Sequence, residues 1–185
     1  MNIDEIKEWL KNNLTEERYE HSLGTADCAK ELAIQFGLDS EKAYLTGLIH
    51  DCAKCLKKET LLDELKNIEL CDGEFENCKT HHAPVGRCTA QKEFGIVDEE
   101  ILSAIRWHTL GKINMTDFEK IIFLADKIEE RTRPKEQIKP IKKALYEENG
   151  LNKALYICYK NTIKSLADRN LKICLTTIEI YNSLL

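Results

Sequence analysis

The stretch LTGLIHDCAK, Leu45 to Lys54, starts as the apolar face of a helix and ends on a histidine and an aspartate side by side. Leu45, Leu48 and Ile49 fall at helical spacing, so this face is expected to point into the core. His50 and Asp51 then interrupt it. The pair is a surface accident, a hydrogen-bonded couple within the core, or two ligands of one metal ion.

The composition describes one helix-rich domain of ordinary size. The 185 residues are 43% hydrophobic and 32% charged, with only eight Gly and three Pro. A net charge of −5 argues against a nucleic-acid partner, because no basic field would attract a polyanion. We find no targeting segment and no apolar run of membrane length, and we read the eight cysteines as reduced thiols. We therefore expect a cytoplasmic protein that binds neither nucleic acid nor a membrane.

Helical periodicity runs along the whole chain, and no segment is a convincing strand. The pattern predicts an all-α, single-domain bundle of seven to nine helices. Thr15 is expected to cap a helix that Gly37 ends, and the segment EKAYLTGLIHDCAK is expected to be helical after Asp39 or Ser40. The exposed faces of the C-terminal helices are compatible with a homodimer.

Titratable residues recur at the apolar faces of these helices. The five histidines are at positions 21, 50, 81, 82 and 108, and four of them lie in or at the end of expected helices with apolar neighbours. Asp126 directly follows the apolar run from Ile121 to Ala125, so its carboxylate is expected to be partly buried and to need a positive partner. That partner is a structural Arg or Lys, or a metal ion. Imidazole and carboxylate ligands favour iron, manganese, cobalt or zinc over calcium or magnesium.

In chain order these residues form a pattern: His21, His50-Asp51, His82, His108 and Asp126. The pattern resembles the H…HD…D signature of the HD-domain superfamily of metal-dependent phosphohydrolases. The segments HHAPVGRCTAQKEFGIVDEEILSAIRWHTLG and FLADKIEERTRP are similar, more narrowly, to the YqeK family of HD hydrolases, over nearly the whole chain. This resemblance implies one HD domain over residues 1–185, with the metal-binding core at about 15–135 and C-terminal helices at about 134–185.

The YqeK resemblance implies symmetrical cleavage of diadenosine tetraphosphate into two ADP at an iron-containing site. His82, rather than His81, matches the family because it directly precedes the APVG segment. A first metal would take His21, His50, Asp51 and Asp126, and His82 and His108 would hold a second, with Asp51 bridging the two. Manganese, cobalt or zinc could replace iron. A hydroxide bridging the metals would be the nucleophile.

A small set of polar residues near the expected ligands could bind the polyphosphate. Lys54 lies three residues after Asp51 and would share its helix face if the helix continues, so we expect Asp51 and Lys54 to act in catalysis. Arg18, three residues before His21, and Arg133, with its planar guanidinium, are further phosphate-binding candidates. Thr109 could donate a hydrogen bond, and His82 would also lie at the substrate. The alternative for each of these residues is a structural role, as a surface charge or a helix cap.

Three other functions are compatible with parts of the pattern. One is an HD nucleotidase or phosphodiesterase acting on another phosphorylated nucleotide. A second is a non-catalytic HD module that binds a nucleotide and regulates a partner, although such a module would be free to lose a ligand. The third is a zinc or redox protein built on Cys52 and Cys55, which form a CxxC.

Overall fold

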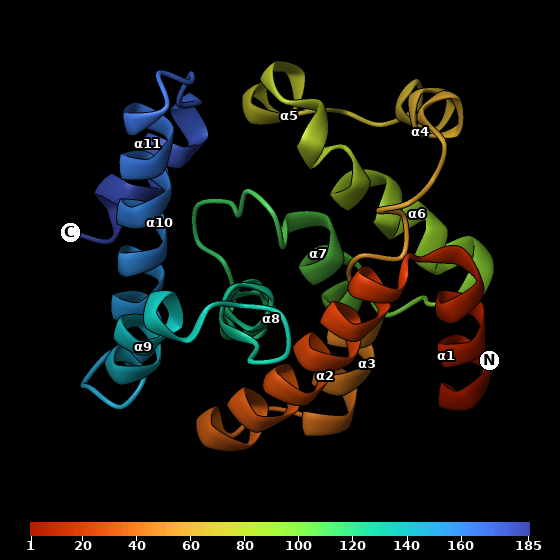
Figure 1. Cartoon of the computed structure of the whole chain (residues 1–185), viewed down its shortest axis with the longest axis horizontal. Coiled ribbons are helices and arrows are strands. Elements are labelled where there is room, and N and C mark those ends of the chain that lie inside the picture. The colour runs from red at the N-terminus through yellow and green to blue at the C-terminus, as the bar shows by residue number, and fades with distance from the viewer.

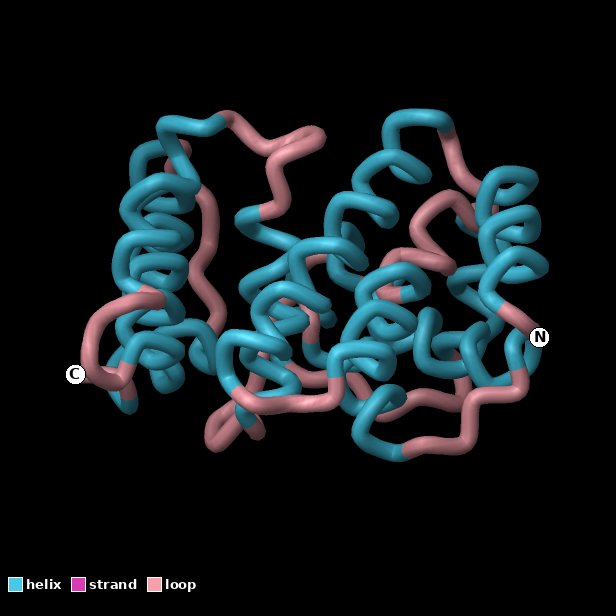
Figure 2. The backbone as a smooth tube through the Cα atoms, turned by 90° about the horizontal axis from the view of Figure 1, so that it is seen from below, coloured by secondary structure: helices cyan, strands magenta, loops and turns pink.

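The computed structural model describes the backbone of residues 1–185 and the side chains of all of them except Glu76. Within this described chain there are eleven α-helices, one 3₁₀-helix and no strand. Figure 2 shows helices joined by loops and turns. The elements are α1 (Ile3–Asn13), α2 (Glu16–Phe36), α3 (Ser40–Ile49), α4 (Lys58–Leu65), α5 (Asp72–Glu76), η1 (Cys78–Thr80), α6 (His82–Phe94), α7 (Glu99–Trp107), α8 (Asp117–Ile128), α9 (Lys135–Ala144), α10 (Gly150–Asp168) and α11 (Leu175–Ser183).

The all-α expectation is confirmed, but the expected number of seven to nine helices is too low. The segment before Gly95 divides into α5, η1 and α6, and the C-terminal segment divides into α10 and α11. In the described residues no helix combines the length and the apolar character needed to cross a membrane.

The helix α8 lies at the centre of the bundle because its middle turn, residues 121–125, is apolar all round. Residues 121–125 are Ile, Ile, Phe, Leu and Ala, and none of them is more than 3% exposed. α8 contacts α2, α3, α7, α9 and α10, and Figure 1 shows it nearly end-on between the α2–α3 pair and the α9–α10 pair. Asp126 is therefore carried on the central element of the fold.

The helices α2 and α3 pack against each other at unusually short range, and a glycine makes this possible. A Cβ atom at Gly47 would lie 2.8 Å from the carbonyl oxygen of Thr25 and 2.9 Å from Cα of Ala26. Thr15 caps the start of α2 and Gly37, in the left-handed conformation at φ 69°, ends it, as the sequence predicts. This close packing brings His21 on α2 toward the end of α3.

The helix before His50, α3, is shorter than the sequence predicts. It ends at Ile49, and residues 50–55 form a series of turns instead of continuing to Lys54. The side chain explains this end, since Nδ1 of His50 donates to the carbonyl oxygen of Gly47 at 2.6 Å. In a continued α-helix that oxygen would accept from the backbone N–H of Asp51. The chain beyond Ile49 turns tightly, with the N–H of Cys52 bonded to the carbonyl of Ile49.

Candidate metal centre

The six expected metal ligands lie together in the interior, although they come from five parts of the chain. His21 lies in α2, His50 and Asp51 follow α3, His82 opens α6, His108 follows α7 and Asp126 lies near the end of α8. All six residues are buried, with exposed fractions from 0% to 7%. The bundle therefore brings helix ends from both halves of the chain to one point.

The ligand atoms form two groups that share Asp51. In one group, atoms of His21, His50 and Asp51 all lie within 4.8 Å of one another, and in the other group the same holds for Asp51, His82 and His108. Asp126 adjoins the first group, since its Oδ1 lies 2.9 Å from Nε2 of His21 and 3.8 Å from Nε2 of His50. One carboxylate thus faces two clusters of imidazoles.

Each of the four histidines is fixed through Nδ1, so that Nε2 faces the centre. The contacts are His21 to Oε1 of Glu129 at 3.1 Å, His50 to the Gly47 carbonyl at 2.6 Å, His82 to the Lys79 carbonyl at 2.9 Å and His108 to the Ile105 carbonyl at 2.7 Å. Carbonyl and carboxylate oxygens only accept, so each Nδ1 carries the proton. Such an outer hydrogen bond is characteristic of metal-binding histidines.

The electrostatics of the cluster suit a cation. Nε2 of His50 is buried and has no hydrogen-bond partner among the described residues. Burial lowers the pKa of His50 to about 3, so its ring is neutral at pH 7. Burial works against ionisation of Asp51, but hydrogen bonds from His108 and His82 oppose it, and the pKa of Asp51 lies well below the usual range. A neutral imidazole and an ionised carboxylate are the forms that bind a divalent metal, so His50 and Asp51 fit a metal centre.

A cavity of about 180 Å³ opens above the centre and carries four basic side chains, those of Arg18, Lys54, Lys127 and Arg133. Arg18 Nη1 lies 3.4 Å from Oδ2 of Asp51, and Arg133 Nη2 lies 2.8 Å from Oδ1 of Asp126. Lys127 is paired with Oδ2 of Asp126. The cavity therefore presents a ring of cations around buried carboxylates, an arrangement suited to a polyanionic ligand.

Lys54 reaches this cavity by a different route from the one predicted. It lies in the turns after α3 rather than on a continued helix face, and its Nζ is 3.1 Å from Nε2 of His82 and 4.0 Å from Oδ1 of Asp51. Burial lowers the pKa of Lys54. The Oγ1 of Thr109 lies 3.2 Å from Nε2 of His82, so this hydroxyl also borders the cavity.

The sequence alone does not single out Lys127 or Glu129. Lys127 looks like an ordinary helix-surface charge in the sequence, but it lines the cavity. Glu129 could have been suspected, because it lies three residues after Asp126 and so near the same face of the expected helix. His81 faces elsewhere, with Nε2 bonded to the Glu74 carbonyl at 2.8 Å.

The cysteine-based alternative receives no support from the described residues. Neither candidate metal group contains a cysteine. Cys52 is buried and its thiol donates to the Gly86 carbonyl, while Cys55 is exposed. Burial raises the pKa of Cys52, which leaves it a poor nucleophile and a poor ligand.

Similarity to known proteins extends along the whole chain. The model of the HD domain family matches residues 18–131. A protein of Bacillus subtilis (strain 168) named "Bis(5'-nucleosyl)-tetraphosphatase, symmetrical" is 39% identical over 183 residues, covering 98% of this chain and 97% of its own. A Staphylococcus aureus (strain NCTC 8325 / PS 47) protein of the same name is 35% identical over 184 residues, covering 98% and 94%.

A solved structure is similar in fold as well as in sequence. It is described as a predicted HD superfamily hydrolase involved in NAD metabolism from Clostridium acetobutylicum. The TM-score is 0.91 at 42% identity, with 100% of this chain and 97% of the other covered.

Proposed function

The chain belongs to the HD domain family, and from this premise we propose that it is a metal-dependent hydrolase that cleaves diadenosine tetraphosphate symmetrically into two ADP. Relatives that match along nearly their whole length bear the name of that activity. The buried histidine and aspartate groups support a divalent metal centre. We further propose that the centre holds two metal ions and that they are iron, with manganese, cobalt or zinc as substitutes.

The observation that carries the proposal is the convergence of four imidazole Nε2 atoms and two carboxylates below a ring of basic side chains. In the proposed assignment one ion is held by His21, His50, Asp51 and Asp126, and the other by Asp51, His82 and His108. When bound, the two ions would supply positive charge for the phosphates and would lower the pKa of a bound water, which would make hydroxide available at neutral pH.

The basic residues of the cavity have a role in the same reaction. Four phosphate groups bring several negative charges, and Arg18, Lys54, Lys127 and Arg133 can pair with the oxygens that lie outside the metal centre. The hydroxyl of Thr109 can donate one further hydrogen bond. Lys54 lies within reach of both His82 and Asp51, so it borders the site proposed for the second metal.

The bond changes follow from symmetry of the products. Water adds to one of the two inner phosphorus atoms, and the bond from that atom to the central bridging oxygen breaks. The bridging oxygen leaves with the other half of the molecule, so each half is ADP. ADP is a stable anion, and its departure needs no protonated side chain.

The test is to incubate metal-loaded protein with diadenosine tetraphosphate and to separate the products by chromatography. ADP as the sole product supports the proposal. AMP together with ATP contradicts symmetrical cleavage and moves the broken bond to an outer anhydride. If two bound metals are verified and no product forms, the proposal is wrong, and other phosphorylated nucleotides become the substrates to examine. Tight nucleotide binding without any turnover would favour the regulatory module.

A further inference from the structure

Three of the four histidines at the centre are held by local backbone. The Nδ1 atoms of these three donate to the carbonyl three residues earlier in the chain: His50 to Gly47, His82 to Lys79 and His108 to Ile105. Each of these histidines lies at a helix terminus or in the turn beside it. Carbonyl oxygens are available there because helix ends leave backbone groups without helical partners.

His21 cannot be held in this way, because it lies inside α2. The carbonyls of residues 17 and 18, the ones within its reach, accept the helix's own N–H groups. Its acceptor comes instead from a side chain 108 residues away in the sequence, with Oε1 of Glu129 at 3.1 Å from Nδ1. The Glu129 side chain is fully buried, so this contact is shielded from water.

The chain after α8 is shaped around this carboxylate. Glu129 accepts from the backbone N–H of Arg131 at 2.7 Å and from that of Thr132 at 3.1 Å, and the Thr132 hydroxyl also donates to it. On the neighbouring helix α2, the residue that faces the Glu129 carboxylate is a glycine, Gly24. A Cβ atom at Gly24 would overlap Oε2 of Glu129, so only glycine leaves room for the carboxylate.

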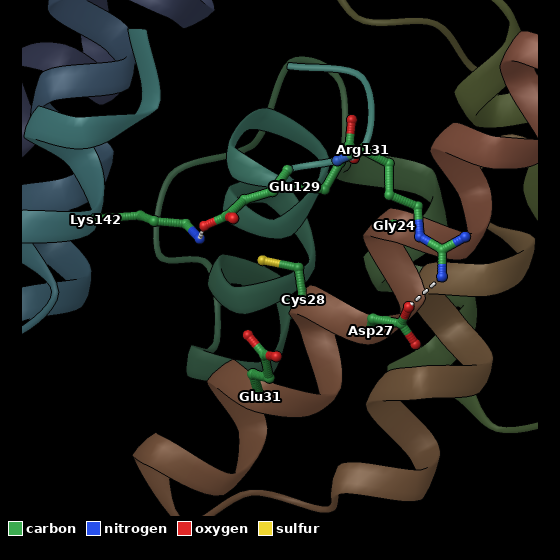
Figure 3. Close-up of a pocket in the computed structure, with 8 residues that line it drawn as sticks. Gly24, Asp27, Cys28, Glu31, Glu129, Arg131 and Lys142 are labelled. Atoms are coloured by element: carbon green, nitrogen blue, oxygen red, sulfur yellow. Dashed lines mark hydrogen bonds and ion pairs between the residues drawn. The ribbon is translucent and has the colours of Figure 1, made fainter. Parts of the chain in front are cut away.

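A pair of ion contacts ties the same segment to α2. Arg131 lies across α2 beside Gly24 and pairs with Asp27 at 2.8 Å, as Figure 3 shows, and with Glu20 at 2.9 Å. These ion pairs hold residues 129–132 against α2 on the outer side, while the Glu129 side chain points inward to His21. Among the described residues, the fold seats a buried carboxylate at Nδ1 of His21 and at Nδ1 of none of the other three histidines.

We propose that Glu129 is a positioning residue for the first metal: it holds His21 with the proton on Nδ1 and directs Nε2 toward Asp126. A carboxylate behind a metal-binding histidine also makes the imidazole a stronger donor to the metal. The proposal rests on the metal centre in the function proposed above, but not on the identity of the substrate. Glu129 does not touch the substrate cavity, whose lining includes its neighbours Lys127 and Arg133.

The test uses the isosteric variant Glu129→Gln and, as matched control, Glu130→Gln. Glu130 is the next residue, but its side chain is exposed and pairs with Lys142. Metal-free protein is titrated with Zn²⁺ in competition with a chelator. We expect roughly 10- to 100-fold weaker binding of one Zn²⁺ in Glu129→Gln, and wild-type affinity in Glu130→Gln.

A spectroscopic readout separates positioning from a purely structural role. In the Zn²⁺-loaded wild type, ¹⁵N NMR of labelled histidine should show His21 as a single Nδ1-protonated form with slow proton exchange. In Glu129→Gln the same ring should show faster exchange or a second tautomer. A role limited to capping the turn at residues 131–132 would lower thermal stability and leave both Zn²⁺ affinity and the His21 signals unchanged. That result overturns the proposal.

A second variant keeps the proposal testable if Glu129→Gln does not fold. Gly24→Ala leaves the carboxylate in the chain but forces it away from its seat, so one Zn²⁺ should again bind more weakly. Unchanged Zn²⁺ affinity in a folded Gly24→Ala protein also overturns the proposal. None of these measurements uses a nucleotide. If the wild type fails to cleave diadenosine tetraphosphate while the Zn²⁺ effects appear, the proposed function fails and this inference stands.

Discussion

The two carboxylate oxygens of Asp51 face different sets of imidazoles, and His82 is the closest of them. Oδ1 lies 3.1 Å from Nε2 of His82 and 3.4 Å from that of His108. Oδ2 lies 3.8 Å from Nε2 of His50 and 3.4 Å from Nη1 of Arg18. A carboxylate whose two oxygens face different partners can serve two metal ions at once. Because α3 ends at Ile49, Asp51 lies in the turn after the helix rather than on a helix face.

Replacing Asp51 with asparagine should remove both metal loading and activity. The asparagine side chain has a similar volume, but its amide is a weak ligand with one oxygen, so it cannot serve both groups. We expect turnover to fall about 1,000-fold, equivalent to about 4 kcal/mol of transition-state stabilisation. Metal analysis of the purified protein and a rate assay check this. Wild-type turnover with two bound metals in Asp51→Asn would refute the bridging role.

The adjacent histidines His81 and His82 provide a matched pair of variants. His82→Ala should retain one metal ion and lose most turnover, because its Nε2 faces Asp51 and His108. His81→Ala should retain both metals, since its ring is bonded to the Glu74 carbonyl instead. The metal-to-protein ratio of the two variants decides the matter. The reverse result would move the ligand to His81.

Arg133 should contribute a planar contact to phosphate that lysine cannot reproduce. Its Nε donates to the Asp126 carbonyl at 2.9 Å and its Nη2 to Oδ1 of Asp126 at 2.8 Å, which fixes the plane of the guanidinium at the border of the cavity. Charged hydrogen bonds of this kind contribute about 1.5–3 kcal/mol. Arg133→Lys should therefore raise KM at least about tenfold. Arg87→Lys, which changes an arginine that pairs with Glu99 outside the cavity, should leave KM unchanged; equal effects in both variants would count against the assignment.

The sequence predicts best those features that depend on neighbouring residues. Thr15 and Gly37 bound α2 as expected, because capping and the left-handed C-terminal residue are local effects. Asp126 is buried as expected, because an apolar run reveals a buried helix wherever the run occurs. The end of α3 was missed, because it depends on the His50 ring taking a carbonyl that the helix would otherwise use.

The contacts between distant segments could not be predicted from local pattern. Glu129 and His21 are 108 residues apart, and nothing in the sequence near either residue indicates that the two are in contact. In the sequence Lys127 is one of several charges after a buried run, and only the packing of α8 against α2 turns it toward the cavity. Contacts between distant segments also make two glycines necessary that do not sit in turns: Gly24 faces Glu129, and Gly47 of α3 faces Thr25 and Ala26 of α2.

Gly47→Ala should destabilise the fold at the α2–α3 contact. The added Cβ would meet backbone atoms of Thr25 and Ala26 within 2.8–3.0 Å, and backbone atoms cannot move aside cheaply. We expect a loss of about 1–3 kcal/mol in the free energy of unfolding, measured by urea denaturation. Gly86→Ala is the control, since the nearest atoms there, Cγ2 of Ile105 at 3.3 Å and the carbonyl oxygen of His50 at 3.5 Å, leave more room than those at Gly47. A loss no greater than the control's would contradict the packing argument.

Acid should weaken the protein partly through Glu119, a buried residue far from the metal ligands in the first turn of α8. Burial opposes its ionisation, but Lys112, at 2.7 Å, and the Ser103 hydroxyl outweigh burial and lower its pKa below the ordinary 4.5. The unfolded chain then binds the proton more readily than the folded one. The stabilisation is therefore complete above pH 4.5 and is lost as the pH falls through the lower folded pKa.

Glu119→Gln removes this contribution, so the variant should be less stable than the wild type at pH 7, and the difference should shrink as the pH falls below 4.5. Urea denaturation at pH 7, 5, 4 and 3 measures it. Glu99→Gln removes an exposed carboxylate at the start of α7 and should show a smaller difference at pH 7. A Glu119→Gln difference that stays constant from pH 7 to pH 3 would mean that the glutamine loses packing or capping rather than charge. The Lys112–Glu119 pair would then have no part in the acid sensitivity of the bundle.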